Sequence, residues 1–140
     1  MQITAIDFKL GSRIETLDEL GEQNPDWQTA RLLAKTGIVQ RHIATSQESP
    51  LSLAEEACRR LFNVVAPKDV DSLIYVTQSP DSTIPTTACL LHERLQLPKE
   101  CLAFDLNQGC SGFVYGLSMA SALLRTGQTT KCLLVCAEAY

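Results

Sequence analysis

Two kinds of apolar pattern run along this chain, and together they predict an alternation of strands and helices. Residues 72–79 (SLIYVTQS) form a continuous apolar and β-branched run, which is typical of a strand buried on both faces of a sheet. Residues 102–107 (LAFDLN) and 131–139 (KCLLVCAEA) have the same character. The opening residues 3–11 (ITAIDFKLG) alternate apolar and polar side chains and predict a further strand. Residues 38–44 (IVQRHIA) are a candidate strand or extended loop.

Apolar residues with helical spacing occupy the stretches between these runs. A short helix is expected over residues 16–23 (TLDELGEQ) beneath a threonine cap, and a second helix over 25–35. Asn24 can cap the second helix, Pro25 suits its first turn, and Gly37 fits its end.

Three longer helices follow. Residues 49–65 have the clearest amphipathic pattern, and Ser52 is a candidate cap. The apolar face of this helix consists of Leu53, Ala57, Leu61 and Val64. Residues 86–97 and 111–127 predict two more helices. A proline ends the first of them, and a glycine ends the second.

The alternation of strand and helix from residue 72 onward predicts an α/β fold with a largely parallel sheet and crossover helices. With 140 residues and 45% hydrophobic content, the chain can bury one core but not two, so a single domain over residues 1–140 is expected. The last strand run reaches the end of the sequence, whereas a central strand normally continues into more chain. We therefore expect these residues to form part of a larger unit.

The charge and hydropathy of the chain argue against some classes of partner. The formal net charge is −4, and no block of lysine and arginine supplies an electrostatic footprint for nucleic acid. No apolar run approaches the roughly 20 residues that span a bilayer, and charges stand where a signal peptide needs an apolar centre. We expect a cytoplasmic protein that binds a small molecule or a protein and neither nucleic acid nor a membrane.

Six cysteines raise the question of disulfides and metals. No C-x-x-C spacing occurs, and neither of the two histidines lies at zinc-finger spacing from a cysteine, so no metal site is expected. Most thiols, including Cys132 and Cys136 in a strand run predicted to be buried, are expected to act as small core residues in a reducing compartment.

One cysteine has a position suited to catalysis. Cys110 stands between the strand run 102–107 and the helix run 111–127, where first-turn amides would stabilise a thiolate nucleophile. Gly109 and Gly112 permit a sharp turn and the close approach of a substrate carbonyl to the backbone. From the spacing alone, a small residue that fills a tight turn explains Cys110 equally well.

No base for Cys110 is evident in the sequence. His42 and His92 are the candidates, and Asp105 could orient a base, but such residues more often satisfy loop amides or lie at the surface. The following helix carries small residues along one face, which predict close packing against another helix or subunit. These small residues are Gly112, Gly116, Ser118, Ala120 and Ser121.

A basic cluster with one aromatic residue lies earlier in the chain. It consists of Trp27, Arg31, Lys35 and Arg41, which could hold a nucleotide diphosphate by stacking and charge. The alternative is an amphipathic helix with Trp27 in the core and a solvated basic face. The spacing is consistent with both interpretations.

Four segments in order resemble a known family. They are KTGIVQRHIA, LIYVTQSPDSTIPTTACLLHERL, AFDLNQGCSGFVYGLSMASALLRTGQ and LLVCAEA. From about Thr36 to Tyr140 the chain resembles the N-terminal half of β-ketoacyl-acyl-carrier-protein synthase III, the initiating condensing enzyme of type II fatty acid synthesis. The resemblance implies the N-terminal half of a thiolase-like fold, with a mostly parallel mixed sheet flanked by helices. The C-terminal half of the family would be absent.

The resemblance also implies the chemistry. In the family the cysteine that matches Cys110 is acylated by an acyl-CoA, and its backbone N–H forms part of the oxyanion hole. A histidine and an asparagine of the C-terminal half then assist the decarboxylation of malonyl carrier protein, whose carbanion attacks the thioester. Without that pair, this chain alone is expected to be a catalytically incomplete acyltransferase. No cofactor beyond the substrates acyl-CoA and malonyl carrier protein is implied, and a homodimer is expected.

Further residues take roles by the same resemblance. Lys35, Thr36 and Gly37 would lie near the CoA entrance, where the family often has arginine in place of lysine. A nucleotide-stacking tryptophan usually stands four residues before that position, whereas Trp27 stands eight before it.

Residues 80–89 would lie at the dimer interface and line the acyl pocket through Ile84 and Pro85. The family commonly has phenylalanine at the position of Ile84, so a differently shaped acyl site is expected. Two alternatives to fatty acid synthesis stay open. They are a non-catalytic truncated fragment or scaffold, and a related starter-unit acyltransferase of secondary metabolism.

Overall fold

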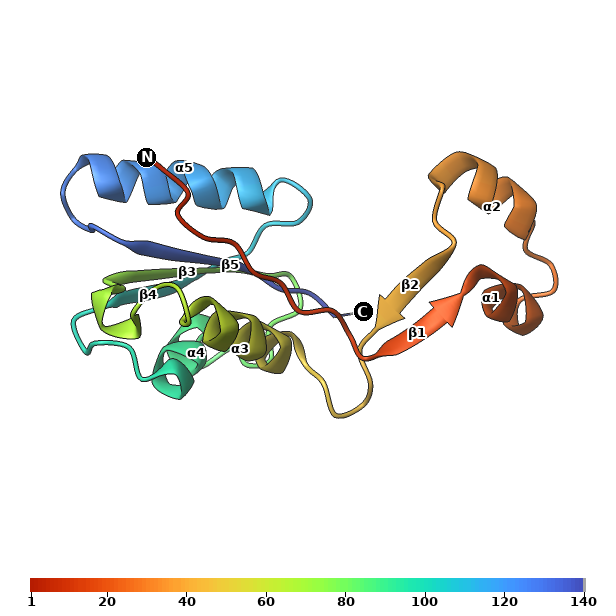
Figure 1. Cartoon of the computed structure of the whole chain (residues 1–140), viewed down its shortest axis with the longest axis horizontal. Coiled ribbons are helices and arrows are strands. Elements are labelled where there is room, and N and C mark those ends of the chain that lie inside the picture. Colours follow the sequence, from red (N-terminus) through yellow and green to blue (C-terminus); the bar gives the residue numbers. More distant parts are fainter. Residues whose placement is uncertain (140) are drawn as a thin grey trace. The chain divides into compact units, whose positions relative to one another are not determined.

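The computed structural model describes residues 1–139, which form two compact units (Figure 1). Met1–Lys9 and the chain from Ser49 onward make up the first unit, and Leu10–Glu48 make up the second. The first unit contains the predicted nucleophile, and the second contains the residues predicted to bind CoA.

A parallel sheet of three strands forms the centre of the first unit. Strand β3 (Ser72–Val76) pairs with β4 (Leu102–Leu106) on one side and with β5 (Cys132–Cys136) on the other. Every residue of β3 is buried, as its continuous apolar run predicts for a central strand. The predicted α/β class and all three strand runs are confirmed.

Three helices cover the two faces of this sheet. These are α3 (Pro50–Leu61) and α4 (Thr87–Leu95) on one face and α5 (Gly112–Arg125) on the other, and a short 3-10 turn η1 (Pro67–Asp69) precedes β3 (Figure 1). Leu73 and Tyr75 of β3 belong to the core beneath α3 and α4. Ile74 and Val76 point the other way and pack beneath α5, so one strand joins both halves of the core.

Polar side chains fix the starts of two helices. Ser49 caps α3 and forms a reciprocal capping box with Ser52, so the prediction of Ser52 as the cap is wrong by one turn. The N-cap residue of α4 makes no side-chain hydrogen bond. Instead the Asp105 carboxylate of β4 accepts hydrogen bonds from the N–H groups of Thr87 (2.9 Å) and Ala88 (2.6 Å). Asp105 therefore ties β4 to the positive end of α4.

The second unit is an antiparallel ribbon with two short helices. It contains β1 (Arg13–Thr16), α1 (Leu17–Gln23), α2 (Thr29–Thr36) and β2 (Gln40–Ile43). Glu15 of β1 is only 4% exposed, and its carboxylate accepts a hydrogen bond of 2.7 Å from the Arg41 guanidinium directly opposite on β2. Arg13 lies 3.2 Å from the same carboxylate. Two cations thus neutralise the buried charge.

Several predicted boundaries shift. The threonine cap of α1 is confirmed, but Asn24 ends α1 and Gln28 begins α2, so the predicted start of the second helix is wrong. Gly37 ends α2 with a φ of 68°, as predicted. Val64 lies beyond the end of α3 and is 75% exposed, so it is not part of the buried face.

Among residues 1–139, no helix combines the length and apolarity needed to cross a bilayer.

The strand predicted over residues 3–11 is wrong. These residues lie in neither a helix nor a strand, and Ile6 and Phe8 are 80% and 70% exposed. A period-two pattern forms a strand only where a second strand offers hydrogen-bond partners. The strand β1, which the pattern did not predict, begins at Arg13 and pairs with β2.

Asp71 ties the loop before β5 to the start of β3. Its carboxylate accepts hydrogen bonds from the Thr129 hydroxyl, from the N–H (2.7 Å) and hydroxyl (2.6 Å) of Thr130, and from the Lys131 N–H (3.0 Å). Burial raises the pKa of Asp71, but these hydrogen bonds outweigh burial and lower the pKa from 3.8 to about 2.

We expect Asp71 to set part of the acid stability of the first unit. Because its folded pKa is depressed, its stabilising contribution should be complete above about pH 4 and be lost as the pH falls toward 2. Urea unfolding should show that Asp71→Asn lowers the free energy of unfolding by about 1–2 kcal/mol at neutral pH and by less at low pH. Asp69→Asn, which removes an exposed ion pair to Lys131, is the control and should change little. A deficit that does not depend on pH would contradict this role.

Candidate functional site

Cys110 lies in the turn that joins β4 to α5. The strand ends at Leu106 and the helix begins at Gly112, so the turn stands at the carboxyl edge of the parallel sheet. Open α/β sheets bind ligands at this edge. The thiol of Cys110 is exposed. The position predicted for Cys110 is confirmed, and its role as a nucleophile stays a prediction.

The first turn of α5 leaves backbone donors free beside Cys110. The N-cap residue Ser111 makes no side-chain hydrogen bond, and the first helical bond runs from the N–H of Tyr115 to the carbonyl of Ser111. Within the described chain, the N–H groups of Phe113 and Val114 have no hydrogen-bond acceptor. Such amides carry the positive end of the helix dipole. The turn can therefore stabilise a thiolate or an oxyanion.

Gly109 and Gly112 allow the turn to pack closely against β3 and the loop after it. A Cβ atom on Gly112 would lie 2.4 Å from Cγ1 of Val76, and one on Gly109 would lie 2.5 Å from Oε1 of Gln78. Neither glycine has a positive φ. Close approach to Val76, rather than a left-handed backbone, is what requires glycine at position 112, whereas the flexible amide end of Gln78 could move away from a methyl group at position 109.

Three of the small residues of α5 face the sheet. A Cβ atom on Gly116 would lie 2.6 Å from Cδ1 of Leu134 on β5, and Ala120 packs in the core beneath the helix. The prediction that this face packs against another helix or subunit is therefore wrong for Gly112, Gly116 and Ala120. The glycines instead let α5 approach the strands.

Glu138 fastens the loop after β3 at the same edge. Its carboxylate accepts hydrogen bonds from the N–H of Gln78 (2.6 Å) and from the N–H (3.1 Å) and hydroxyl (2.6 Å) of Ser79. Gln78 in turn lies against Gly109. Neither Glu138 nor Gln78 was predicted as a site residue. The available signal was that each stands near the carboxyl end of a predicted strand run, because such positions meet at one edge of a parallel sheet.

The two candidate bases and the aspartate that could orient a base are engaged elsewhere. Ring nitrogens of His42 and His92 each lie 2.9 Å from a backbone carbonyl oxygen, and Asp105 caps α4. In the part of the chain that the structure describes, none of them forms a hydrogen bond with Cys110. The interpretation of Asp105 as a residue that satisfies backbone amides is confirmed.

The residues predicted to bind CoA lie in the second unit. Lys35, Thr36 and Gly37 are exposed at the end of α2. Trp27 is 52% exposed, so the alternative that places it in a core is wrong. Arg41 is paired with the buried carboxylate of β1. Contact between these residues and a nucleotide stays a prediction.

Ile84 and Pro85 lie in the loop between β3 and α4. Ile84 is 88% exposed, and Pro85 is exposed as well. A large apolar side chain with this exposure is available for contact with an acyl chain or a second subunit. Their assignment to an acyl pocket stays a prediction.

The other thiols differ in access to solvent. Burial raises the pKa of Cys58 to about 12 and that of Cys101 to about 11, so both are poor nucleophiles. Cys89 and Cys136 are exposed, like Cys110. The prediction that Cys136 is buried is wrong, because β5 is an edge strand of this sheet.

Across residues 1–139, no three His, Cys, Asp or Glu side chains gather in a way that could hold a metal ion.

Comparisons with known proteins agree on one family. The profile of a family described as 3-oxoacyl-[acyl-carrier-protein (ACP)] synthase III matches residues 104–140. A beta-ketoacyl-[acyl-carrier-protein] synthase III of Methylococcus capsulatus is 40% identical over 131 residues, which are 92% of this chain and 37% of that protein. The synthase III of Thioalkalivibrio sulfidiphilus is 39% identical over 87% of this chain and 37% of its own length. The chain thus spans little more than a third of these relatives.

Solved structures extend the likeness to the fold. A crystal structure of a 3-oxoacyl-(acyl-carrier-protein) synthase III matches with a TM-score of 0.90 and 44% identity over 96% of this chain and 40% of that one. The Thermus thermophilus synthase III matches with a TM-score of 0.89 and 33% identity, over 99% of this chain and 43% of that one. AbyA1, a tetronic acid condensing enzyme, matches with a TM-score of 0.84 and 25% identity, over 96% and 44%. The predicted thiolase-like fold is confirmed.

The contact between Gly112 and Val76 yields a test of how the turn is held. We expect Gly112→Ala to destabilise the first unit by about 1–3 kcal/mol, because the new methyl group overlaps a buried side chain. The displaced helix start should also change the rate at which iodoacetamide alkylates Cys110. Adding Val76→Ala should recover part of the loss, measured as a double-mutant cycle by urea unfolding.

Ser118→Ala, on the exposed side of α5, is the matched control and should leave both readouts unchanged. Independent, additive effects of the substitutions at positions 112 and 76 would show that this contact does not position the turn.

Proposed function

We propose that this chain belongs to the β-ketoacyl-[acyl-carrier-protein] synthase III family and carries the nucleophile of a 3-oxoacyl-acyl-carrier-protein synthase III, which its likeness in sequence and fold to members of that family supports. The observation that carries the proposal is the exposed thiol of Cys110 between the end of β4 and the free amides of α5. This position combines a nucleophile with donors for developing negative charge.

The proposed reaction has two steps. The Cys110 thiolate attacks the carbonyl carbon of an acyl-CoA, a tetrahedral oxyanion forms and collapses, and CoA leaves as its thiolate. The acyl group is then a thioester on Cys110. Malonyl carrier protein loses CO₂, and the resulting carbanion attacks this thioester. The product is 3-oxoacyl carrier protein, and the Cys110 thiolate is regenerated.

The backbone N–H of Cys110 is proposed to donate to the oxyanion of the first step, with Gly109 and Gly112 giving the substrate access to the backbone. Trp27 and the segment Lys35, Thr36 and Gly37 are proposed to contact CoA. The second step needs groups that stabilise a carbanion, which the family supplies through a histidine and an asparagine. No described residue takes that role beside Cys110, so this chain alone is proposed to stop at the acyl-enzyme.

Carrier protein is the proposed acceptor. The synthase III relatives that are 36–40% identical include acyl-carrier-protein in their names, whereas the tetronic acid condensing enzyme is 25% identical. Because of that difference in sequence identity, we propose that this protein acts in fatty acid biosynthesis. We also propose that it forms a homodimer, because the resemblance to the family implies one.

Intact-mass spectrometry after incubation with a panel of acyl-CoAs tests the proposal. We expect slow addition of one acyl group, which hydroxylamine removes because it is a thioester. Cys110→Ala should abolish the adduct. The matched control is Cys89→Ala, which removes another exposed thiol and should leave the adduct intact. Acylation that survives Cys110→Ala, or a chain that takes no acyl group from any CoA, would contradict a nucleophilic role and favour a non-catalytic scaffold.

A further inference from the structure

We propose that Glu48 is a positioning residue for CoA. Its carboxylate clamps the base of the second unit, and this clamp keeps Trp27 and residues 35–37 in the arrangement that contacts the nucleotide. The inference rests on the proposed contact between the second unit and CoA. It does not rest on the role of Cys110.

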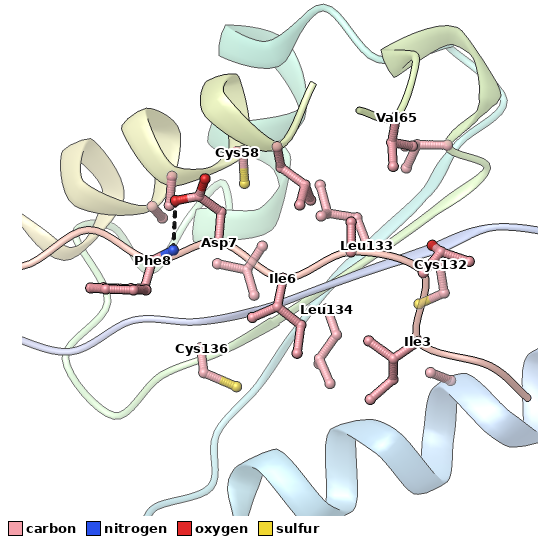
Figure 2. A pocket seen from close by; sticks show the side chains of 18 of the residues that line it. Ile3, Ile6, Asp7, Phe8, Cys58, Val65, Cys132, Leu133, Leu134 and Cys136 are labelled. Carbon is pink, nitrogen blue, oxygen red and sulfur yellow. Dashed lines mark hydrogen bonds between the residues drawn. The ribbon is translucent and has the colours of Figure 1, made fainter. Parts of the chain in front are cut away.

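The second unit has no apolar interior of its own. Among residues 10–48, Glu15 is the only buried side chain, and both apolar core clusters of the described chain consist of residues of the first unit. Figure 2 shows the contrast in the first unit, where apolar side chains such as Ile6, Leu133 and Leu134 gather around a cavity. A two-stranded ribbon without apolar burial is only marginally stable. Polar contacts must therefore hold the second unit in shape.

Glu48 supplies such contacts at the base of the ribbon. One of its oxygens, Oε2, accepts hydrogen bonds from the N–H (3.1 Å) and hydroxyl (3.0 Å) of Ser12 and from the N–H (2.8 Å) and hydroxyl (3.2 Å) of Thr45. Ser12 directly precedes β1, and Thr45 follows the last residue of β2 by two positions. The carboxylate thus joins the two chains beyond their last backbone pair, Arg13 with Ile43. Hydrogen bonds to a charged acceptor are about twice as strong as those between neutral groups.

The two chains also approach each other closely at this base. A Cβ atom on Gly11 would lie 2.4 Å from the carbonyl carbon of Ile43, and a ring nitrogen of His42 lies 2.9 Å from the carbonyl oxygen of Gly11. The hydrogen bonds from Thr45 and Ser12 lower the pKa of Glu48 from 4.5 to about 2. The carboxylate is therefore ionised at neutral and at mildly acidic pH, and the clamp keeps its charge-assisted hydrogen bonds there.

The ribbon connects this base to the residues proposed to contact CoA. At its other end, the carbonyl of Val39 accepts a hydrogen bond of 3.0 Å from the N–H of Leu17. The hydroxyl of Thr36 donates to the carbonyl of Leu32 (2.8 Å) and accepts from the N–H of Ile38 (3.2 Å), which fixes the turn before β2. Four backbone pairs, a length of about 14 Å, separate the two ends. A bend of about 10° in an opened ribbon of this length would displace its far end by about 2 Å, enough to break contacts with a ligand.

Trp27 provides the first test, because it is the only tryptophan of the chain and its fluorescence reports on the second unit. Addition of CoA should change this fluorescence. We expect Glu48→Ala to raise the dissociation constant for CoA about fivefold or more, since only the ordered fraction of the ribbon binds. Glu48→Gln should bind almost as the unaltered chain does, because its carbonyl oxygen can take the place of Oε2. Glu22→Ala removes an exposed carboxylate of α1 and is the matched control, which should leave the dissociation constant unchanged.

A pair of acyl donors separates the positioning of CoA from a general loss of structure. The pair consists of an acyl-CoA and the N-acetylcysteamine thioester of the same acyl group, which carries no nucleotide. Below saturation, Glu48→Ala should slow the acylation of Cys110 by the acyl-CoA about fivefold or more. Acylation by the nucleotide-free thioester should be unchanged, because Cys110 lies in the first unit. Intact-mass spectrometry measures both rates.

Three results would overturn the proposal. They are Trp27 fluorescence that does not respond to CoA, equal CoA affinity in Glu48→Ala and the unaltered chain, and equal slowing of acylation with both donors. Absence of acylation with either donor would instead contradict the nucleophilic role of Cys110, and the CoA titration would still decide the role of Glu48.

Discussion

The complete burial of β3 is the constraint on which the rest of the first unit depends. This strand is paired on both edges and covered on both faces. Its two neighbours run parallel to it, so the connections between the strands must be crossovers, which helices supply. Parallel strands bring their carboxyl ends to one edge. The turn with Cys110, the loop with Gln78 and the carboxylate of Glu138 meet there because each directly follows one of the three strands. The place of the site is a consequence of topology.

The closeness of α5 to the sheet then determines what the site can do. Gly112 and Gly116 present no side chains toward Val76 and Leu134, so the helix axis can approach the strands more closely than an alanine at either position would allow. The start of α5 is thereby held at the end of the strands, and its free amides stand beside Cys110. Electrostatic stabilisation depends on such fixed dipoles, since donors already in place need no reorganisation when charge develops. The close contact between α5 and the strands thus has two effects. It packs the buried side of the helix, and it fixes the position of the free amides at the N-terminus of the helix.

The sequence predicted the central architecture well because buried strands and crossover helices leave local signals. The run SLIYV is apolar whatever its partners are, and the start of α5 after LAFDLN follows from its spacing. Contacts between distant residues were missed for the opposite reason. Glu138 and Gln78 are 60 positions apart, and nothing in either local sequence predicts their hydrogen bond. The strand predicted at residues 3–11 failed because a strand needs a paired neighbour as well as a pattern.

The outer face of α5 shows that the environment of Cys110 depends on what covers this helix. Val114 and Tyr115 in its first turns are each more than half exposed, although a helix that faces water normally carries polar residues there. An apolar surface of this kind is typical of a contact face. A surface that covers this face would remove water from the first turn of α5. Removing water lowers the local dielectric, so the free amides would interact more strongly with a thiolate or an oxyanion. In that arrangement, the residues that make α5 apolar on its outer side would strengthen the electrostatics at its N-terminus without touching the substrate.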